Sequence, residues 1–284
     1  MILFVRDLTV IDFSYLCQQR GLLGESYIVD VELHGDLDQM SMVLDFARVK
    51  KNIKKAIDEL VDHKLAIPAL SAATDLIQAD RSVVKFQSAK GLIQVASPAD
   101  AFVAIPAAQI SMDSISSYLT EHIKALLPAN VLKLVLSLRT EQISGFSYHY
   151  THGLKKHDGN CQRIAHGHRS TIQIYQDQML SPRLNKYWCE RWEDIYLGST
   201  EDQCDAGALR YLDAEPDALN FCYDAPQGYF EISLPAAVCE VVPCDTTVEC
   251  LADFIASELK QQQPDHQFKV VAYEGVGKGA IGFA

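Results

Sequence analysis

The sequence predicts an α+β protein of two tandem units, each with two strands, helical material, and two further strands separated by another helix. Three observations carry this prediction: an internal repeat, segments in which apolar residues alternate, and segments in which they recur at helical spacing. The chain has 284 residues, enough for two domains of ordinary size. We expect the first unit to span residues 1–142 and the second to span residues 143–284.

The internal repeat is clearest in the later part of each unit, where residues 91–119 align with residues 228–255. With one gap, this alignment matches glycines and prolines in register: Gly91 with Gly228, Pro98 with Pro235, and Pro106 with Pro243. Glycine and proline mark fixed turns of the backbone, so their shared positions indicate a shared chain path.

The predicted elements follow in the same order along each unit. Residues 27–31 show the two-residue period of a strand. Residues 43–65 place apolar side chains three and four positions apart, which is typical of an amphipathic helix. A second helix is predicted over residues 111–127, with a counterpart over residues 247–260. The last strands read KLVLSL and KVVAYE, whereas residues 176–227 show no clean amphipathic helix.

The composition argues against several classes of protein. Lys and Arg number 25 against 37 Asp and Glu, so the net charge is −12, and a nucleic-acid partner is not expected. No apolar run approaches the roughly 20 residues of a membrane helix, so we expect no membrane partner. Arg6 and Asp7 interrupt the first apolar segment, which therefore resembles a strand more than a signal peptide. These features predict a cytoplasmic protein.

Histidine is concentrated in one short window, since five of the nine lie between residues 149 and 168. His166 and His168 begin a predicted strand and point to the same face, because strand side chains alternate. His152 ends the preceding strand, which the short connection makes a plausible antiparallel neighbour. Three imidazoles that leave a fourth position open are typical of catalytic zinc. The pattern predicts a Zn²⁺ site; the alternative is a polar loop that is rich in histidine.

Cys161 lies in the loop between these two strands. A thiolate beside a metal cation can serve as a base or a nucleophile. His149 is out of phase with His152 on its strand, and His157 lies in the loop, so neither is expected to be a ligand.

Four stretches together carry a resemblance to a known family. They are the pattern of His152, Cys161, His166 and His168; the helical segment 43–65, which contains Asp62–His63; DTTVECLADFI, with Glu249; and VVAYEG, with Glu274. Together these stretches resemble the 6-pyruvoyl-tetrahydropterin synthase family, including its bacterial branch, 6-carboxy-tetrahydropterin synthase of queuosine biosynthesis. The resemblance covers nearly the whole chain as two family units.

The resemblance implies the tunnelling fold, in which each unit is a four-stranded antiparallel sheet with helices on one face and the units assemble into barrels. Active sites of the family lie between neighbouring units. A homo-oligomer is therefore expected, and three two-unit chains would supply the six units of the family's hexamer.

The two halves carry complementary parts of the site that the resemblance implies. In the first unit, the three ligand positions are aligned with Cys17, Leu23 and Glu25, so this unit lacks the zinc ligands but keeps Asp62–His63. The second unit has the three histidines and no Asp–His pair between residues 169 and 227. We therefore expect the halves to divide one site between them.

The resemblance also implies a zinc-dependent lyase that acts on 7,8-dihydroneopterin triphosphate and forms a 6-pyruvoyl- or a 6-carboxy-tetrahydropterin. Its catalytic residues are expected to be Cys161, Asp62 and His63. Its substrate-binding residues are expected to be Glu274, Glu249, Thr246 and Thr247. A local group of basic residues near the triad would suit a polyphosphate: Lys155, Lys156, Arg163 and Arg169.

Other interpretations stay open at the level of sequence. Asp62–His63 could simply end a helix, and Glu249 could be an ordinary carboxylate in the first turn of one. A non-catalytic protein of the same fold could bind a pterin or purine, or scaffold a partner. A different zinc lyase or hydrolase on this fold is the third alternative.

Overall fold

The fold is known from a computed structural model, which describes residues 1–78 and 81–284. The first half contains the following elements: β1 (Ile2–Cys17), β2 (Gly21–Gly35), α1 (Phe46–Arg48), a π-helical turn (Val49–Ile53), α2 (Lys54–Leu60), β3 (Leu65–Pro68), β4 (Thr74–Ile77), β5 (Arg81–Ser88), β6 (Gly91–Pro98), β7 (Phe102–Ile105), α3 (Met112–Lys124) and β8 (Val131–Arg139).

The second half contains a comparable series: β9 (Ser147–His152), β10 (His166–Gln176), β11 (Met179–Leu180), α4 (Pro182–Arg191), β12 (Ile195–Ser199), β13 (Gln203–Cys204), β14 (Ala218–Ala225), β15 (Gly228–Pro235), β16 (Cys239–Val242), α5 (Val248–Gln262), β17 (Phe268–Tyr273) and β18 (Gly279–Phe283). No helix among the described residues is long and apolar enough to span a bilayer.

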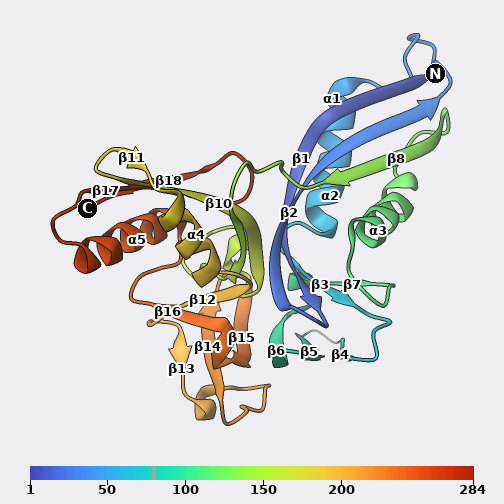
Figure 1. The fold of residues 1–284 in the computed structure, drawn as a ribbon. Helices are drawn as coiled ribbons and strands as arrows, with labels where there is room; N and C mark the ends of the chain where they lie inside the picture. Colours follow the sequence, from blue (N-terminus) through green and yellow to red (C-terminus); the bar gives the residue numbers. More distant parts are fainter. Residues whose placement is uncertain (79–80) are drawn as a thin grey trace.

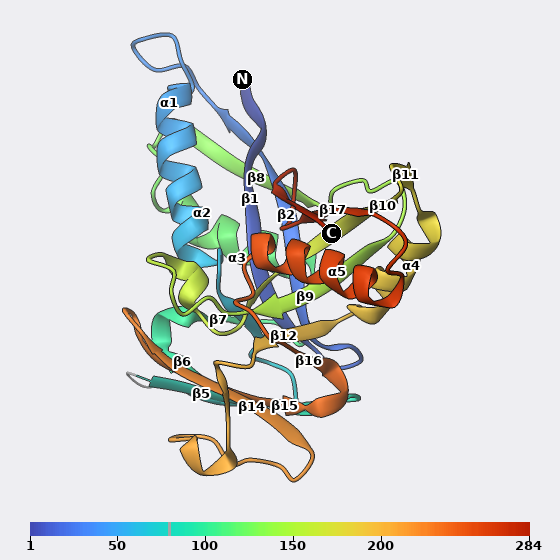
Figure 2. The same ribbon diagram turned by 90° about the vertical axis from the view of Figure 1, so that its left-hand side faces the viewer.

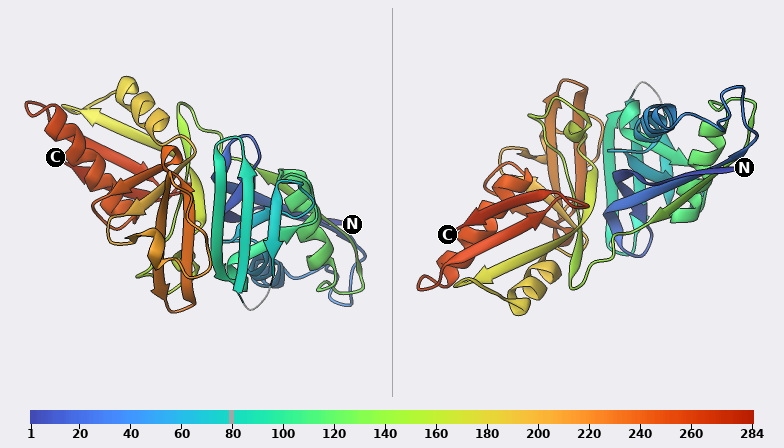
Figure 3. Two further views of the ribbon diagram at one scale, coloured as in Figure 1. Left: turned by 90° about the horizontal axis from the view of Figure 1, so that it is seen from below. Right: turned by 90° about the horizontal axis from the view of Figure 1, so that it is seen from above.

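The described strands form three sheets, which Figure 1 shows with the first half in blue and green and the second in yellow to red. One sheet, in the order β7-β3-β1-β2-β8, comes from the first half alone. Another, in the order β16-β12-β9-β10-β17-β18, comes from the second half, with β11 on β10. The third has the order β13-β14-β15-β6-β5-β4, so both halves contribute to it, and Figure 3 shows these strands side by side.

The mixed α+β class agrees with the sequence prediction, but the sheets are not the predicted four-stranded antiparallel ones. β1, β2 and β8 are antiparallel, whereas β3 is parallel to both β1 and β7. The second half repeats this arrangement, since β12 is parallel to β9 and β16. The parallel strand arises because α1 and α2 run back along the sheet in the direction of β1 (Figure 2), so that the next strand, β3, pairs parallel to β1.

The helices cover one face of each main sheet. In the first half, apolar side chains from α2 and α3 pack on β1, β2 and β8; they include Ile57, Ile115 and Leu119. In the second half, α4 and α5 bury Trp188, Leu251 and Ile255 against β10 and β17 in the same way. A third core lies between the sheet to which both halves contribute and the short strands of the other two sheets.

The helix boundaries follow local capping chemistry. Ser111 caps α3 through a capping box, and Thr247 caps α5 by accepting a hydrogen bond from the Cys250 amide, close to where the sequence predicted these helices. The helix predicted over residues 43–65 is shorter and is interrupted by the π-helical turn. Within the unassigned residues 176–227, Ser181 caps α4.

The two main sheets meet where β2 packs on β9 and β10, and this contact places the site described below. A Cβ atom on Gly24 would lie 1.9 Å from the Tyr150 carbonyl oxygen, and one on Gly167 would lie 2.7 Å from Cα of Gly24. Both positions therefore need glycine. Beside them, the hydroxyls of Ser14 and Thr151 lie 2.9 Å apart and form a hydrogen bond across the halves.

Candidate active site

Three histidines from the second half, the histidine triad, lie together at the contact between the halves: His152, His166 and His168. His152 ends β9 and faces His166 in the antiparallel register, and His168 follows two residues along β10. One ring nitrogen from each lies within 4.8 Å of the others, and all three side chains are buried. The structure therefore brings the predicted ligands together.

Hydrogen bonds hold one ring nitrogen each of His152 and His166, whereas neither ring nitrogen of His168 has a hydrogen-bond partner among the described residues. Nδ1 of His152 lies 2.9 Å from the Thr246 carbonyl oxygen, and Nδ1 of His166 lies 2.9 Å from the Arg163 carbonyl oxygen. A carbonyl only accepts hydrogen bonds, so these Nδ1 atoms carry the hydrogen. The buried Nε2 atoms of all three rings have no hydrogen-bond partner among the described residues. Buried polar atoms are rarely left unpaired, and three free imidazole nitrogens that face one another fit a divalent metal ion.

Burial also sets the charge of the triad. Desolvation lowers the pKa of His152 and of His166 well below the ordinary value of histidine, and the neighbouring imidazoles add to the effect. A neutral imidazole is the form that binds metal, so these shifts favour binding.

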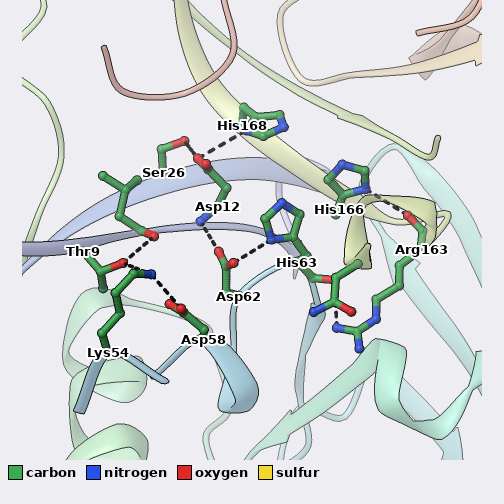
Figure 4. A network of polar contacts seen from close by, with 12 residues as sticks. Thr9, Asp12, Ser26, Lys54, Asp58, Asp62, His63, Arg163, His166 and His168 are labelled. Atoms are coloured by element: carbon green, nitrogen blue, oxygen red, sulfur yellow. Dashed lines mark hydrogen bonds and ion pairs between the residues drawn. The ribbon is translucent and has the colours of Figure 1, made fainter. Parts of the chain in front are cut away.

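Asp62 and His63 reach this site from the turn after α2. Oδ2 of Asp62 lies 2.6 Å from Nδ1 of His63, while its Oδ1 accepts a hydrogen bond of 2.9 Å from the amide of Asp12. Burial opposes a charge on His63, but the hydrogen bonds with Asp62 and Cys161 outweigh it and raise the pKa of His63 to about 10. Figure 4 shows His63 directed toward His166, and their ring centroids are 5.3 Å apart.

Cys161 lies in a short turn, Asn160–Gln162, in the loop between β9 and β10. Its sulfur lies within 4.8 Å of ligand nitrogens of both His63 and His166. A thiol, an imidazole that is paired with a carboxylate, and the triad therefore occupy one small volume that neither half forms alone.

Glu274 follows β17 directly and approaches the triad at His168. Its Oε1 atom lies 3.9 Å from Nε2 of His168, and its Oε2 atom lies 3.8 Å from Nζ of Lys278. Gly275 follows with a positive φ of 69°, and a Cβ atom there would lie 2.5 Å from the Asp12 carboxylate. This close approach and the positive φ both require glycine at this position.

The other predicted substrate-binding residues are arranged differently. Thr246 is buried and holds the ring of His152, whereas Thr247 caps α5. Glu249 is exposed in the first turn of α5. Among the described residues, it forms no hydrogen bond or ion pair with the triad. Thr246 and Thr247 line a separate cavity of about 140 Å³ together with Lys155, Asp202 and Asp245.

The expected group of free basic residues is not what the structure shows. Lys155 forms ion pairs of 2.8 Å with Glu201 and Asp202. Lys156 pairs with Glu201 and Asp245 at 3.0 Å. Arg163 is buried, and Arg169 donates to the carbonyl of Glu141. The two lysines are therefore paired with acidic residues from distant segments, whereas the two arginines donate to neutral oxygens.

Sequence reasoning missed two charged residues at the site. Asp12 is buried in β1, and its Oδ1 atom lies 3.2 Å from Nδ1 of His168. Burial alone would raise the pKa of Asp12, but His168 and Lys278 outweigh it and hold this pKa well below the usual range. Lys278 approaches Oδ2 of Asp12 at 3.2 Å. A single carboxylate within the apolar run TVIDF was the available signal, since a buried charge requires a partner.

The chain was compared with protein-family models, curated proteins and solved structures. Residues 16–143 match the family model described as 6-pyruvoyl tetrahydropterin synthase. The predicted resemblance to this family is confirmed for residues 16–143. Among solved structures, the 6-pyruvoyl tetrahydropterin synthase of Plasmodium vivax is 19% identical, with a TM-score of 0.37, and the alignment covers 49% of this chain and 97% of that one. The Plasmodium falciparum protein is 16% identical, with a TM-score of 0.37 and the same coverage. No curated protein matches the chain.

The match to 6-pyruvoyl tetrahydropterin synthase falls on the half that carries Asp62–His63, whereas the triad lies outside it. The register explains why the first half has no equivalent triad. Leu23 faces Tyr15 just as His166 faces His152, and Glu25 occupies the place of His168. Tyr15, rather than the predicted Cys17, is therefore the counterpart of His152, because the glycine contact and not side-chain similarity sets the alignment.

Proposed function

We propose that this chain is a zinc-dependent tetrahydropterin synthase-like lyase that acts on 7,8-dihydroneopterin triphosphate. The observation that carries the proposal is the histidine triad, whose three buried and unpartnered Nε2 atoms face one another beside a thiol and an Asp–His pair. The match of residues 16–143 to 6-pyruvoyl tetrahydropterin synthase supports a synthase-like activity on a pterin. The proposal covers both product classes, the 6-pyruvoyl- and the 6-carboxy-tetrahydropterins, since they share this substrate.

The Nε2 atoms of His152, His166 and His168 would hold the Zn²⁺ ion, and three nitrogen ligands leave a fourth position open for substrate. When bound, the ion supplies Lewis acidity to the side-chain oxygens of the substrate and so acidifies the adjacent C–H and O–H groups. The carbonyl groups of Thr246 and Arg163 keep the hydrogens on Nδ1 and orient two of the rings.

Cys161 and His63 are the groups that we assign to proton transfer. Cys161 as thiolate takes a proton from a side-chain carbon, and His63 as imidazolium returns one to the same side chain, so the protein's proton count is unchanged. Asp62 accepts the hydrogen of Nδ1 of His63 and so orients the ring. The raised pKa of His63, about 10, means that its ring is a proton donor at neutral pH.

Glu274 is the residue that we assign to pterin recognition, because a carboxylate can accept two hydrogen bonds from an amino-pyrimidine edge. Its position 3.9 Å from His168 supports this role, since a pterin held there would place its side chain near the triad. Thr246, Thr247 and Glu249 complete the family's pterin segment, with Thr246 acting through His152.

We also propose that residues 1–142 and 143–284 are two tunnelling-fold units and that three chains assemble into a homo-oligomer. The repeated strand order of the two main sheets supports the division. Exposed apolar side chains on the first sheet support assembly, because Ile2, Phe4 and Leu132 are 55%, 57% and 64% exposed. All eight cysteines are free, which supports a cytoplasmic location.

The experiment that tests the function measures zinc content and turnover of 7,8-dihydroneopterin triphosphate together. Wild type is compared with Cys161→Ala, His63→Ala and His166→Ala, and with His266→Ala as a control, since His266 lies on the surface with Asp177 as its partner. We expect about one zinc ion per chain, as for a three-histidine site, in every protein except His166→Ala.

Turnover should be lost in all three site variants and retained in the control. Zinc binding without turnover, unchanged by Cys161→Ala and His63→Ala, would instead favour the non-catalytic pterin-binding alternative. A wild-type protein without zinc would contradict the metal assignment.

A further inference from the structure

Asp12 is the one residue of β1 whose carboxylate contacts the histidine triad (Figure 4). Its side chain is 6% exposed, so the carboxylate is buried. The carboxylate contacts groups from three separate segments: Nδ1 of His168 at 3.2 Å, Oγ of Ser26 at 2.5 Å and Nζ of Lys278 at 3.2 Å. Ser26 donates a hydrogen bond to this carboxylate, whereas His168 and Lys278 approach it at ion-pair distance.

The backbone of Asp12 joins the same site to the proton-transfer pair. Its amide donates a hydrogen bond of 2.9 Å to Oδ1 of Asp62, and its carbonyl accepts one of 2.7 Å from the amide of His63. Asp12 is therefore in contact with the Asp–His pair of the first half and with the triad of the second half.

The geometry also separates Asp12 from the metal ligands themselves. Its carboxylate approaches Nδ1 of His168, whereas the triad faces inward through Nε2, on the other side of each ring. The other two rings are held at Nδ1 by carbonyl oxygens of the second half. His168 is the member of the triad whose Nδ1 is approached by a carboxylate of the first half, at 3.2 Å.

The corresponding place in the first half supports a pairing between these positions. In the strand register, His149 occupies the position of Asp12, and Glu25 occupies that of His168. Nδ1 of His149 bonds the Gly24 carbonyl oxygen at 2.7 Å and lies 3.9 Å from Oε2 of Glu25, so the same two places hold an imidazole and a carboxylate with their positions exchanged. An acid–imidazole pair therefore recurs across the contact between the halves.

We propose that Asp12 is a positioning residue for His168: its carboxylate holds the hydrogen on Nδ1 and thereby presents Nε2 to the metal ion. This inference rests on the proposed metal site and adds a first-half residue to it. Ser26 and Lys278, at 2.5 Å and 3.2 Å from the same carboxylate, fix its position. A carboxylate that orients a ligating histidine typically affects metal affinity 10- to 100-fold, which sets the size of the expected effect.

The test compares Asp12→Asn with Asp177→Asn in the full-length protein. Asp177 is a matched control because its Oδ2 atom lies 2.5 Å from Nδ1 of His266, an exposed pair outside the site. Zinc affinity is measured by competition with a chromophoric chelator. We expect Asp12→Asn to weaken zinc binding roughly 10- to 100-fold and Asp177→Asn to leave it unchanged. Equal affinity of wild type and Asp12→Asn would overturn the inference.

A second readout needs neither bound metal nor a variant of Asp12. Long-range proton–nitrogen NMR of metal-free wild type reports which ring nitrogen of His168 carries the hydrogen, and His168→Gln assigns its signal. We expect hydrogen on Nδ1; hydrogen on Nε2 alone would overturn the inference even if Asp12→Asn failed to fold. If wild type bound no zinc while His168 kept its Nδ1 hydrogen, the proposed function would fail and the positioning role would stand.

Discussion

The imidazole ring of His63, from the first half of the chain, lies 5.3 Å from the ring of His166, from the second half. The packing of β2 on β9 and β10 creates this contact, and it requires glycine at both Gly24 and Gly167. The proton-transfer pair and the triad therefore depend on the contact between the halves, and the proposed activity should be sensitive to it.

We predict that Asp62→Asn lowers kcat by at least about 10²-fold, the usual contribution of one general acid or base. The amide would no longer hold the proton on Nδ1 of His63, which the carboxylate reaches at 2.6 Å. Steady-state turnover of 7,8-dihydroneopterin triphosphate measures the effect. Asp58→Asn is the control, because Asp58 pairs with Lys54 on the same helix. An equal loss in both variants would show damage to the helix rather than loss of proton transfer.

The sequence could predict the triad because its geometry is local. A hairpin register and a two-residue spacing place His152, His166 and His168 on one face, and both can be read from neighbouring residues. Likewise, α3 and α5 follow from apolar spacing and from the caps Ser111 and Thr247. The mixed α+β class follows from these elements.

The remaining features depend on contacts between distant segments. Asp12 meets His168 only because the two halves pack together, and Lys155 loses its free charge to Glu201 and Asp202 from another loop. The parallel pairing of β3 with β1 likewise follows from the path of the helices over the sheet. The spacing of residues within one segment cannot predict these contacts between distant segments.

We predict that the stability of the protein falls as the pH rises from about 4.5 to about 7, because of Glu25. Burial raises the pKa of Glu25 from 4.5 to about 7, so the folded state binds a proton that the unfolded state has released in this range. More protons bound to the folded state mean that the free energy of unfolding decreases with pH. The full shift corresponds to about 3 kcal/mol.

Urea denaturation of wild type and Glu25→Gln at several pH values checks this prediction. The amide does not titrate, so the variant should lose most of this pH dependence. Compared with wild type, its free energy of unfolding should therefore be higher above pH 7 than at pH 4.5. Parallel stability curves for the two proteins between pH 4.5 and 7 would rule out the role of Glu25.

We predict that Gly24→Ala destabilises the protein by about 1–3 kcal/mol, the usual cost of an overpacked site. The new Cβ atom would lie 1.9 Å from the Tyr150 carbonyl oxygen, so the two sheets would have to separate. Thermal unfolding of Gly24→Ala should show a lower Tm, and its zinc affinity should fall because the contact between the halves also places Asp12. Gly207→Ala is the control, since nothing lies within 4 Å of its added Cβ atom. An unchanged Tm in Gly24→Ala would contradict the close contact described here.

We predict that Zn²⁺ raises the Tm of the metal-free protein, because binding to the folded state alone stabilises it by about 2.7 kcal/mol at a hundred times Kd. The unpartnered Nε2 atoms make this gain specific to the triad. His166→Ala should abolish the increase in Tm, and Mg²⁺ should not replace zinc, since it prefers oxygen ligands. His122→Ala is the matched control: His122 lies on α3 and bonds the Tyr118 carbonyl. Scanning calorimetry before and after chelation measures each Tm. A zinc-dependent increase of equal size in His166→Ala would place the binding site elsewhere.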